Sequence, residues 1–206
     1  MRLVLRLPAA AVIALLLAGC FGTAASPSAS GAATDTPSVP SATTDATAAP
    51  TVEPVPSEEL GEFSCELPLH VDATVPRANI TDVRVGTHAE YDRVVFEFTD
   101  GIPEASLERA EPPFVQDGSG LPVDVEGTSF LRLTMRGGTK QTEDGTSSYD
   151  GSTDFAAGFP ALVHLVEGGD FEAQSTWYMG LDSEACVRIF TLTGDGAPRL
   201  VVDLQH

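Results

Sequence analysis

The sequence predicts an all-β domain, built as an antiparallel β-sandwich of two sheets. After residue 59, apolar and polar residues alternate with a period of two in most segments, which is typical of half-buried strands. Clusters of turn-forming residues, such as "DGIPE", "DGSGLP" and "TGDGAP", separate these segments. No segment carries a convincing amphipathic helical pattern of about twelve residues or more. Eight or so short strands with turns between them favour a sandwich.

The strands expected first lie between residues 80 and 111. "YDRVVFEF" (91–98) has the strongest alternation, with Val94, Phe96 and Phe98 on one face. The flanking segments "ITDVRVG" (80–86) and "ASLERAE" (105–111) alternate less regularly. Enrichment in β-branched and aromatic residues supports the strand assignment, because such side chains pack well on a pleated surface.

Five further strands are expected in the second half of the domain. They are "SFLRLTMR" (129–136), "ALVHLVEG" (161–168), "STWYMGL" (175–181), "CVRIFTL" (186–192) and "PRLVVDLQH" (198–206). Residues 137–160 have no periodicity, so they form either a long excursion loop or a partly mobile segment. Loops of this length are uncommon and often functional, which makes this one a candidate contact surface.

The start of the chain has the features of an export signal. Arg2 and Arg6 precede an uncharged apolar run over residues 7–18, which is shorter than the roughly 20 residues that a membrane-spanning helix needs. The following "LAGC" resembles the lipobox of bacterial lipoproteins, in which the cysteine thiol is linked to diacylglycerol. This resemblance implies a signal peptide over 1–19 and a lipid anchor at Cys20.

Two acyl chains give durable membrane retention. We therefore expect the mature protein on the outer face of the bacterial cytoplasmic membrane, facing the cell wall. The alternative is an ordinary secretory signal cut near Ala24 or Ala25, which would discard Cys20.

Residues 20–58 consist mostly of Ala, Ser, Thr, Pro and Gly. Such a stretch buries too little apolar surface to offset its chain entropy, so it predicts a disordered linker. As a random coil its ends would lie on the order of 30 Å apart, and fully extended they would reach about 120 Å. The remaining residues, 59–206, have the length of a single domain.

The formal charge of the whole chain is −19. A field of this sign argues against nucleic acid and anionic membrane surfaces as partners. Contact with an anionic envelope polymer would need a local arginine cluster or a bridging cation. The simpler interpretation is that the acidic surface serves solubility.

Cys65 and Cys186 are the two cysteines outside the export signal, and they predict a disulfide in an extracytoplasmic domain. The alternative is a pair of buried free thiols. No second cysteine or histidine lies at zinc-ligand spacing from either residue. We expect no metal site and no cofactor.

Catalytic patterns are weak. Ser119 lies between glycines, but the segment is not a G-x-S-x-G elbow and predicts a turn. His70, His88, His164 and His206 are scattered, and His164 is expected to be a satisfied or surface histidine. Oxygen-rich loops can hold calcium. The 137–160 segment contains Asp144, Asp150 and Asp154, but their spacing does not fit the EF-hand pattern.

Charged residues are dense in the 91–98 strand, which contains Asp92, Arg93 and Glu97. Alternation allows Arg93 to share a face with Asp203 of a neighbouring strand. The pattern favours a structural ion pair over a ligand site.

Three segments, in this order and spacing, carry a family resemblance: "YDRVVFEF", "GGDFEAQSTWYMGL" (168–181) and "RIFTLTGDGAPRLVVDLQH" (188–206). With "DGSGLPVDVEG" between them, they resemble the AMIN-like domain of actinobacterial lipoproteins over roughly residues 78–206. The resemblance implies a β-sandwich associated with peptidoglycan binding and envelope localisation. It attaches no catalytic residues, so none is transferred.

The sequence therefore favours a non-catalytic binding module that contacts peptidoglycan or an envelope protein, through exposed residues such as Tyr178, Arg132 and Arg136. One alternative is an extracytoplasmic carboxylate hydrolase, which predicts a pocket containing two carboxyl groups with displaced pKa values. Another is a small-ligand carrier, which requires an apolar cavity inside the sandwich. The oligomeric state is not predicted.

Overall fold

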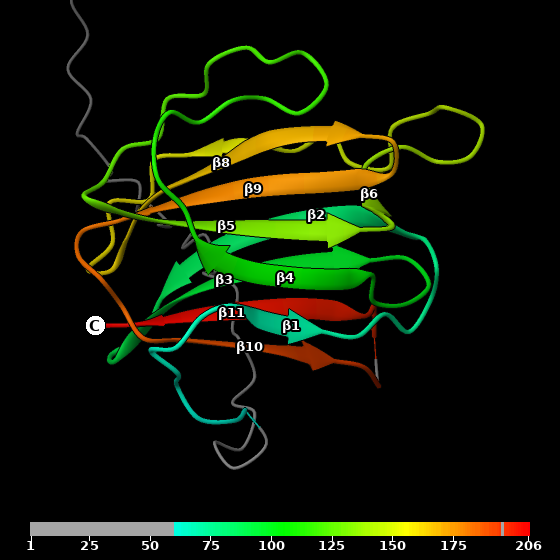
Figure 1. The fold of residues 1–206 in the computed structure, drawn as a ribbon. Coiled ribbons are helices and arrows are strands. Elements are labelled where there is room, and N and C mark those ends of the chain that lie inside the picture. Colours follow the sequence, from blue (N-terminus) through cyan, green and yellow to red (C-terminus); the bar gives the residue numbers. More distant parts are fainter. Residues whose placement is uncertain (1–59, 195) are drawn as a thin grey trace, which may run out of the picture. The chain divides into compact units, whose positions relative to one another are not determined.

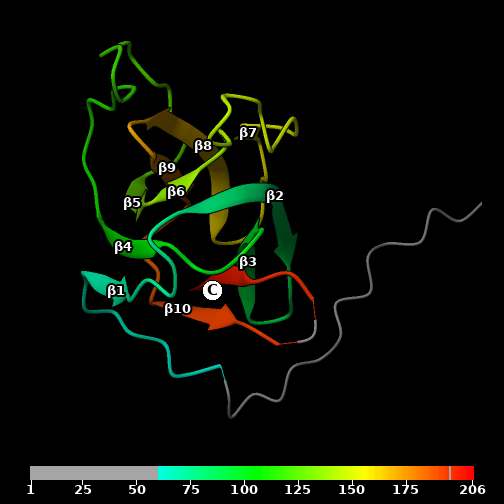
Figure 2. The same cartoon turned by 90° about the vertical axis from the view of Figure 1, so that its right-hand side faces the viewer.

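The computed structural model describes residues 60–194 and 196–206, and these residues form two packed β-sheets without a helix (Figures 1 and 2). The six-stranded sheet has the order β1-β4-β5-β9-β8-β7 and the five-stranded sheet the order β10-β11-β3-β2-β6. The six-stranded sheet contains β1 (Leu69–Val71), β4 (Glu104–Arg109), β5 (Ser129–Arg136), β7 (Asp154–Phe155), β8 (Leu162–Phe171) and β9 (Gln174–Leu181). The five-stranded sheet contains β2 (Ala78–Thr87), β3 (Tyr91–Phe98), β6 (Gly138–Thr139), β10 (Val187–Leu192) and β11 (Arg199–Gln205).

The predicted all-β sandwich is confirmed, and each of the eight predicted strands corresponds to a strand of the structure. The strands that the sequence missed are β1, β6 and β7, which have two or three residues each. A segment this short cannot display a period of two, so alternation gave no signal. The pairing is antiparallel except between β2 and β6, which run parallel.

The core lies between the two sheets and is filled by large side chains. Phe96 of β3 meets Trp177 of β9 edge to face, with 5.3 Å between the ring centroids. Both are fully buried, as are Phe98, Leu133 and Met179. Alternating residues of β3, β5, β9 and β11 supply this core, because their other faces point outward. Among the described residues, large side chains occupy the space between the sheets, which argues against the carrier alternative and its apolar interior cavity.

The segment 137–160 folds back onto the sheets, which favours the ordered excursion over the mobile alternative. It contains β6 and β7, and an isolated bridge joins Gln141 to Ser147. Thr139 donates a hydrogen bond to Asp170 at 2.7 Å, and Lys140 forms a partly buried ion pair with Glu167 at 2.6 Å. These contacts fix the excursion against β8.

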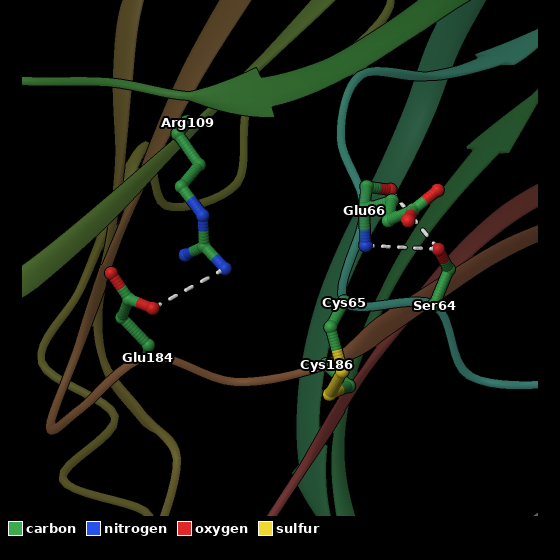
Figure 3. The surroundings of a disulfide bond; sticks show 6 residues. All are labelled: Ser64, Cys65, Glu66, Arg109, Glu184 and Cys186. Atoms are coloured by element: carbon green, nitrogen blue, oxygen red, sulfur yellow. Dashed lines mark hydrogen bonds and ion pairs between the residues drawn. A yellow bond between two sulfur atoms is a disulfide. The ribbon is translucent and has the colours of Figure 1, made fainter.

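The structure joins the two cysteines that the sequence predicts to pair (Figure 3). Cys65 and Cys186 have Cα atoms 4.2 Å apart, and 121 positions separate them in sequence. Next to the disulfide, Ser64 and Val187 exchange backbone hydrogen bonds of 2.7 and 2.8 Å. The start of the domain is therefore attached to the edge of the five-stranded sheet at β10.

Residues 60–194 and 196–206 include no helix with the length and apolar character that a membrane span requires. Cys20, the 1–19 signal and the 20–58 linker lie outside the described residues.

Candidate functional site: a polar trough on the six-stranded sheet

The outer face of the six-stranded sheet carries three rows of polar side chains that cross β4, β5 and β9, the strands shown side by side in Figure 1. The register sets these rows, because directly opposed residues point to the same face. The first row contains Glu104, Arg136 and Gln174; the middle row Ser106, Thr134 and Thr176; the third row Glu108, Arg132 and Tyr178.

The middle row forms the floor of a trough. Its side chains end in short hydroxyl groups, while the rows on either side carry long charged side chains. The resulting hollow has a volume of about 480 Å³, within the range of small-molecule sites. His70 of β1 borders it on one side and Asp117 on the other.

The ion pairs at the two ends of the trough differ in distance and in exposure. In the third row, Arg132 donates two hydrogen bonds to one oxygen of Glu108, at 3.0 and 2.6 Å. This hydrogen bonding raises the pKa of Arg132. In the first row, Arg136 and Glu104 are 4.0 Å apart and their side chains are 71% and 57% exposed. The first-row groups are thus available to a ligand, whereas those of the third row are already bound to each other.

Figures 1 and 2 show the long excursion between β4 and β5. Its residue Asp117 lines the trough. Phe114 packs on Tyr178 and on Phe130, with ring centroids 4.8 and 5.0 Å apart. Asp117 then accepts a hydrogen bond of 2.6 Å from the Thr176 hydroxyl on the floor. The excursion returns close to the sheet at Gly180, where any side chain would collide with the carbonyl oxygen of Glu126.

The prediction that Tyr178 is an exposed contact aromatic is wrong. The excursion covers its ring, leaving the residue 5% exposed, and its hydroxyl donates to the Val115 carbonyl at 3.2 Å. Alternation alone placed Tyr178 on the outer face and could not show that a distant loop packs over it. The exposed aromatic beside the trough is Phe171, which is 53% exposed and pairs with Gln174 across β8 and β9.

The predicted ion pair between Arg93 and Asp203 is present on the outer face of the five-stranded sheet, away from the trough. Arg93 donates two hydrogen bonds to Asp203, at 2.7 and 2.9 Å, and Arg188 adds a third at 2.7 Å. Burial opposes the charge on Arg93, but hydrogen bonding and attraction from Asp203 outweigh it and raise the pKa of Arg93. Arg188 also lies over the rings of Phe63 and Tyr91, at 4.5 and 5.0 Å from their centroids. These buried contacts join β3, β10 and β11, so the cluster has a structural role. The sequence analysis did not predict that Arg188 takes part in it.

The other charged residues of the 91–98 strand have separate roles. Asp92 is fully buried and accepts backbone hydrogen bonds from Ala161 and Leu162, at 2.7 and 2.8 Å. Glu97 forms a surface ion pair with Arg84 at 3.2 Å. These acids do not converge on a ligand site.

The remaining sequence candidates have ordinary structural surroundings. Ser119 lies in a turn and donates to Gln116 at 2.8 Å. His164 accepts from the backbone N–H of Glu126 at 3.1 Å and contacts Asp154 at 2.9 Å, so both ring nitrogens have partners. Within the described part of the chain, no group of three histidine, cysteine or acidic residues is arranged to hold a metal ion.

Among the residues that the structure describes, Glu167 and Asp144 carry carboxyl groups with displaced pKa values, and both lie outside the trough. Burial raises the pKa of Glu167, against the opposing influence of Lys140. Hydrogen bonds from Thr142 and Thr146 lower the pKa of Asp144.

The two packed sheets and the polar trough define the class of this protein: it is an all-β sandwich domain with a hollowed polar face on its six-stranded sheet. The chain belongs to the AMIN-like domain family, whose model matches residues 78–206. AMIN-like domains are generally extracytoplasmic, peptidoglycan-binding modules without catalytic activity. No curated protein and no solved structure gives a significant match.

Proposed function

We propose that this chain is an envelope lipoprotein of the actinobacterial type, whose sandwich domain binds peptidoglycan without catalysing a reaction. In this proposal residues 1–19 are a signal peptide, and Cys20 carries the lipid that retains the chain on the outer face of the cytoplasmic membrane. Residues 20–58 are the tether and residues 59–206 the binding domain. Family membership and the "LAGC" tetrad support the location.

The trough is the observation that carries the binding proposal. It combines guanidinium groups, carboxylates and hydroxyls in one hollow of about 480 Å³. Hydroxyl and amide groups of a glycan or its attached peptide need donors and acceptors close together, and this face supplies both. An envelope protein is the other partner that the sequence analysis left open.

The arginines make this contact possible despite the charge of −19. Arg132 and Arg136 project from the same strand into the trough, where they offset two of the three carboxylates that line it, those of Glu104, Glu108 and Asp117. The trough therefore needs no bridging cation for this contact.

Sedimentation with purified cell-wall sacculi tests the proposal. Residues 21–206 are mixed with sacculi at low and high salt, each with and without calcium. We expect retention at low salt that does not depend on calcium, because the trough carries arginines beside its carboxylates and so presents groups of both signs. Failure to sediment under all four conditions would contradict peptidoglycan binding and leave an envelope protein as the partner.

A further inference from the structure

We propose that the first-row end of the trough, formed by Glu104 and Arg136, recognises a zwitterionic α-amino acid centre, in which a free ammonium and a free carboxylate are attached to the same carbon atom. This inference rests on the proposed function, because it names the chemical group that the trough would select in a wall polymer with peptide branches. Glu104 accepts hydrogen bonds from the ammonium and Arg136 donates to the carboxylate.

In the first and third rows of the trough, the acidic side chains come from one strand and the basic side chains from its neighbour. Glu104 and Glu108 both lie on β4, whereas Arg132 and Arg136 both lie on β5. Each acid is directly opposite an arginine, so a negative row runs beside a positive row along the trough. Two residues of the same sign are four positions apart on one strand, which places them about 13 Å from each other.

This arrangement disfavours ligands of a single charge. An anion over Arg136 would meet the carboxylates of Glu104 and Asp117, and the charge of −19 on the chain. A cation over Glu104 would meet Arg136. A ligand that presents both signs within a few ångströms satisfies both protein groups at once, with its dipole opposed to that of the protein pair.

The first row is the end at which such a ligand can enter. Separating Arg136 from Glu104 costs little, because an ion pair this exposed, with its atoms 4.0 Å apart, contributes little to stability. Arg132 and Glu108 are held together by two shorter hydrogen bonds and are less available. A planar guanidinium can hold a carboxylate through two parallel hydrogen bonds, which makes Arg136 suited to this role.

The neighbouring side chains fit the remainder of such a ligand. The hydroxyls of Ser106 and Thr134 lie beside the first-row pair on the floor and can bond to amide groups that continue from the amino acid. Phe171 forms an apolar lip at the same end, because it is directly opposite Gln174. A small apolar side chain on the ligand would pack against its exposed ring.

The test uses alanine with its two end-blocked analogues, N-acetylalanine and alaninamide. Each is titrated into residues 21–206 while NMR records the Nε–H signal of Arg136 and the backbone amides of β4 and β5. We expect alanine to shift these signals saturably, and each blocked analogue to bind at least about tenfold more weakly, because each lacks one of the two charges. Equal shifts with all three compounds, a response to N-acetylalanine alone, or no response to alanine would each overturn the inference.

Variants locate the site. Arg136→Gln and Glu104→Gln should each weaken alanine binding about tenfold or more. Arg84→Gln removes an arginine from another exposed ion pair, on the five-stranded sheet, and should leave binding unchanged. Equal losses in all three variants would overturn the assignment. Sacculus sedimentation without alanine binding would reject this inference and leave the proposed function intact, whereas alanine binding without sedimentation would reject the wall polymer as the partner.

Discussion

Arg93 and Asp203 are joined by two buried hydrogen bonds across the neighbouring strands β3 and β11. Asp203 has no exposed surface, and a second arginine, Arg188, donates to it from β10. One carboxylate therefore compensates two guanidinium groups that are themselves almost completely buried. Its removal would leave both positive charges without their partner.

Asp203→Asn should destabilise the domain by about 3–5 kcal/mol, which is the cost of leaving a buried charge uncompensated. The side chain keeps its shape, so the effect isolates the charge. Chemical denaturation followed by the fluorescence of Trp177 measures the free energy of unfolding. Glu97→Gln is the matched control, because it removes a carboxylate from a surface ion pair on the same sheet and should cost less than about 1 kcal/mol. An equal loss of unfolding free energy in the two variants would refute the stabilising role of Asp203 between Arg93 and Arg188.

The double variant Cys65→Ser, Cys186→Ser should lower the free energy of unfolding by about 4–5 kcal/mol, because the disulfide closes a loop of 121 positions in the unfolded chain. Denaturant titration of the oxidised and variant proteins provides the measurement. Adding a reductant should destabilise the wild-type protein and leave the variant unchanged. The disulfide would be contradicted if a reductant, added under conditions that unfold the wild-type protein, left its free energy of unfolding unchanged.

His88 should make the domain less stable in mild acid. Burial, followed by the nearby positive charge of Arg93, lowers the pKa of His88 below its ordinary 6.5. The unfolded chain therefore binds a proton at higher pH than the folded one, so stability is lost as the pH falls from about 6.5 through the lowered folded value.

His88→Phe preserves an aromatic ring on Tyr91, which the imidazole stacks on at 4.5 Å, and removes the titration. Urea denaturation from about pH 7.5 to about pH 5.5 should give a smaller loss of stability for this variant than for the wild-type chain. Other titrating groups are common to both proteins and cancel in the comparison. Identical pH dependence would show that His88 does not contribute.

Cys20→Ala should abolish lipid attachment and release the chain from the membrane fraction, if the proposed anchor is correct. Metabolic labelling with a radioactive fatty acid, followed by cell fractionation, measures both effects. Ala24→Leu is a control aimed at the alternative secretory cleavage site. Labelling that persists in the Cys20 variant would contradict the lipoprotein proposal.

The strands could be predicted because their alternation is a local property. Val94, Phe96 and Phe98 reveal which face of β3 is buried without reference to any other element, and the structure buries all three completely. Likewise, pairing of Cys65 with Cys186 follows from counting. The short strands β1, β6 and β7 depend on longer neighbours, and the local sequence does not encode them strongly.

The trough could be predicted only in part. Alternation places Arg132, Thr134 and Arg136 on one face of β5, but the opposing acids become visible only when the register with β4 is known. Burial of Tyr178 depends on an excursion that begins more than sixty positions earlier in the chain. Tertiary pairing, and not local propensity, decides which outward-facing residues stay exposed.

Thr134 lies at the centre of the trough floor, so a large side chain at this position would block binding in the trough. Thr134→Trp would fill the hollow, and Thr191→Trp places the same ring on an exposed threonine of β10 in the other sheet. Thermal unfolding first establishes that both variants fold. In low-salt sacculus sedimentation, we expect Thr134→Trp to lose at least about tenfold in affinity and Thr191→Trp to bind like the wild-type chain. Undiminished binding by a folded Thr134→Trp variant would contradict the assignment of the trough as the binding site.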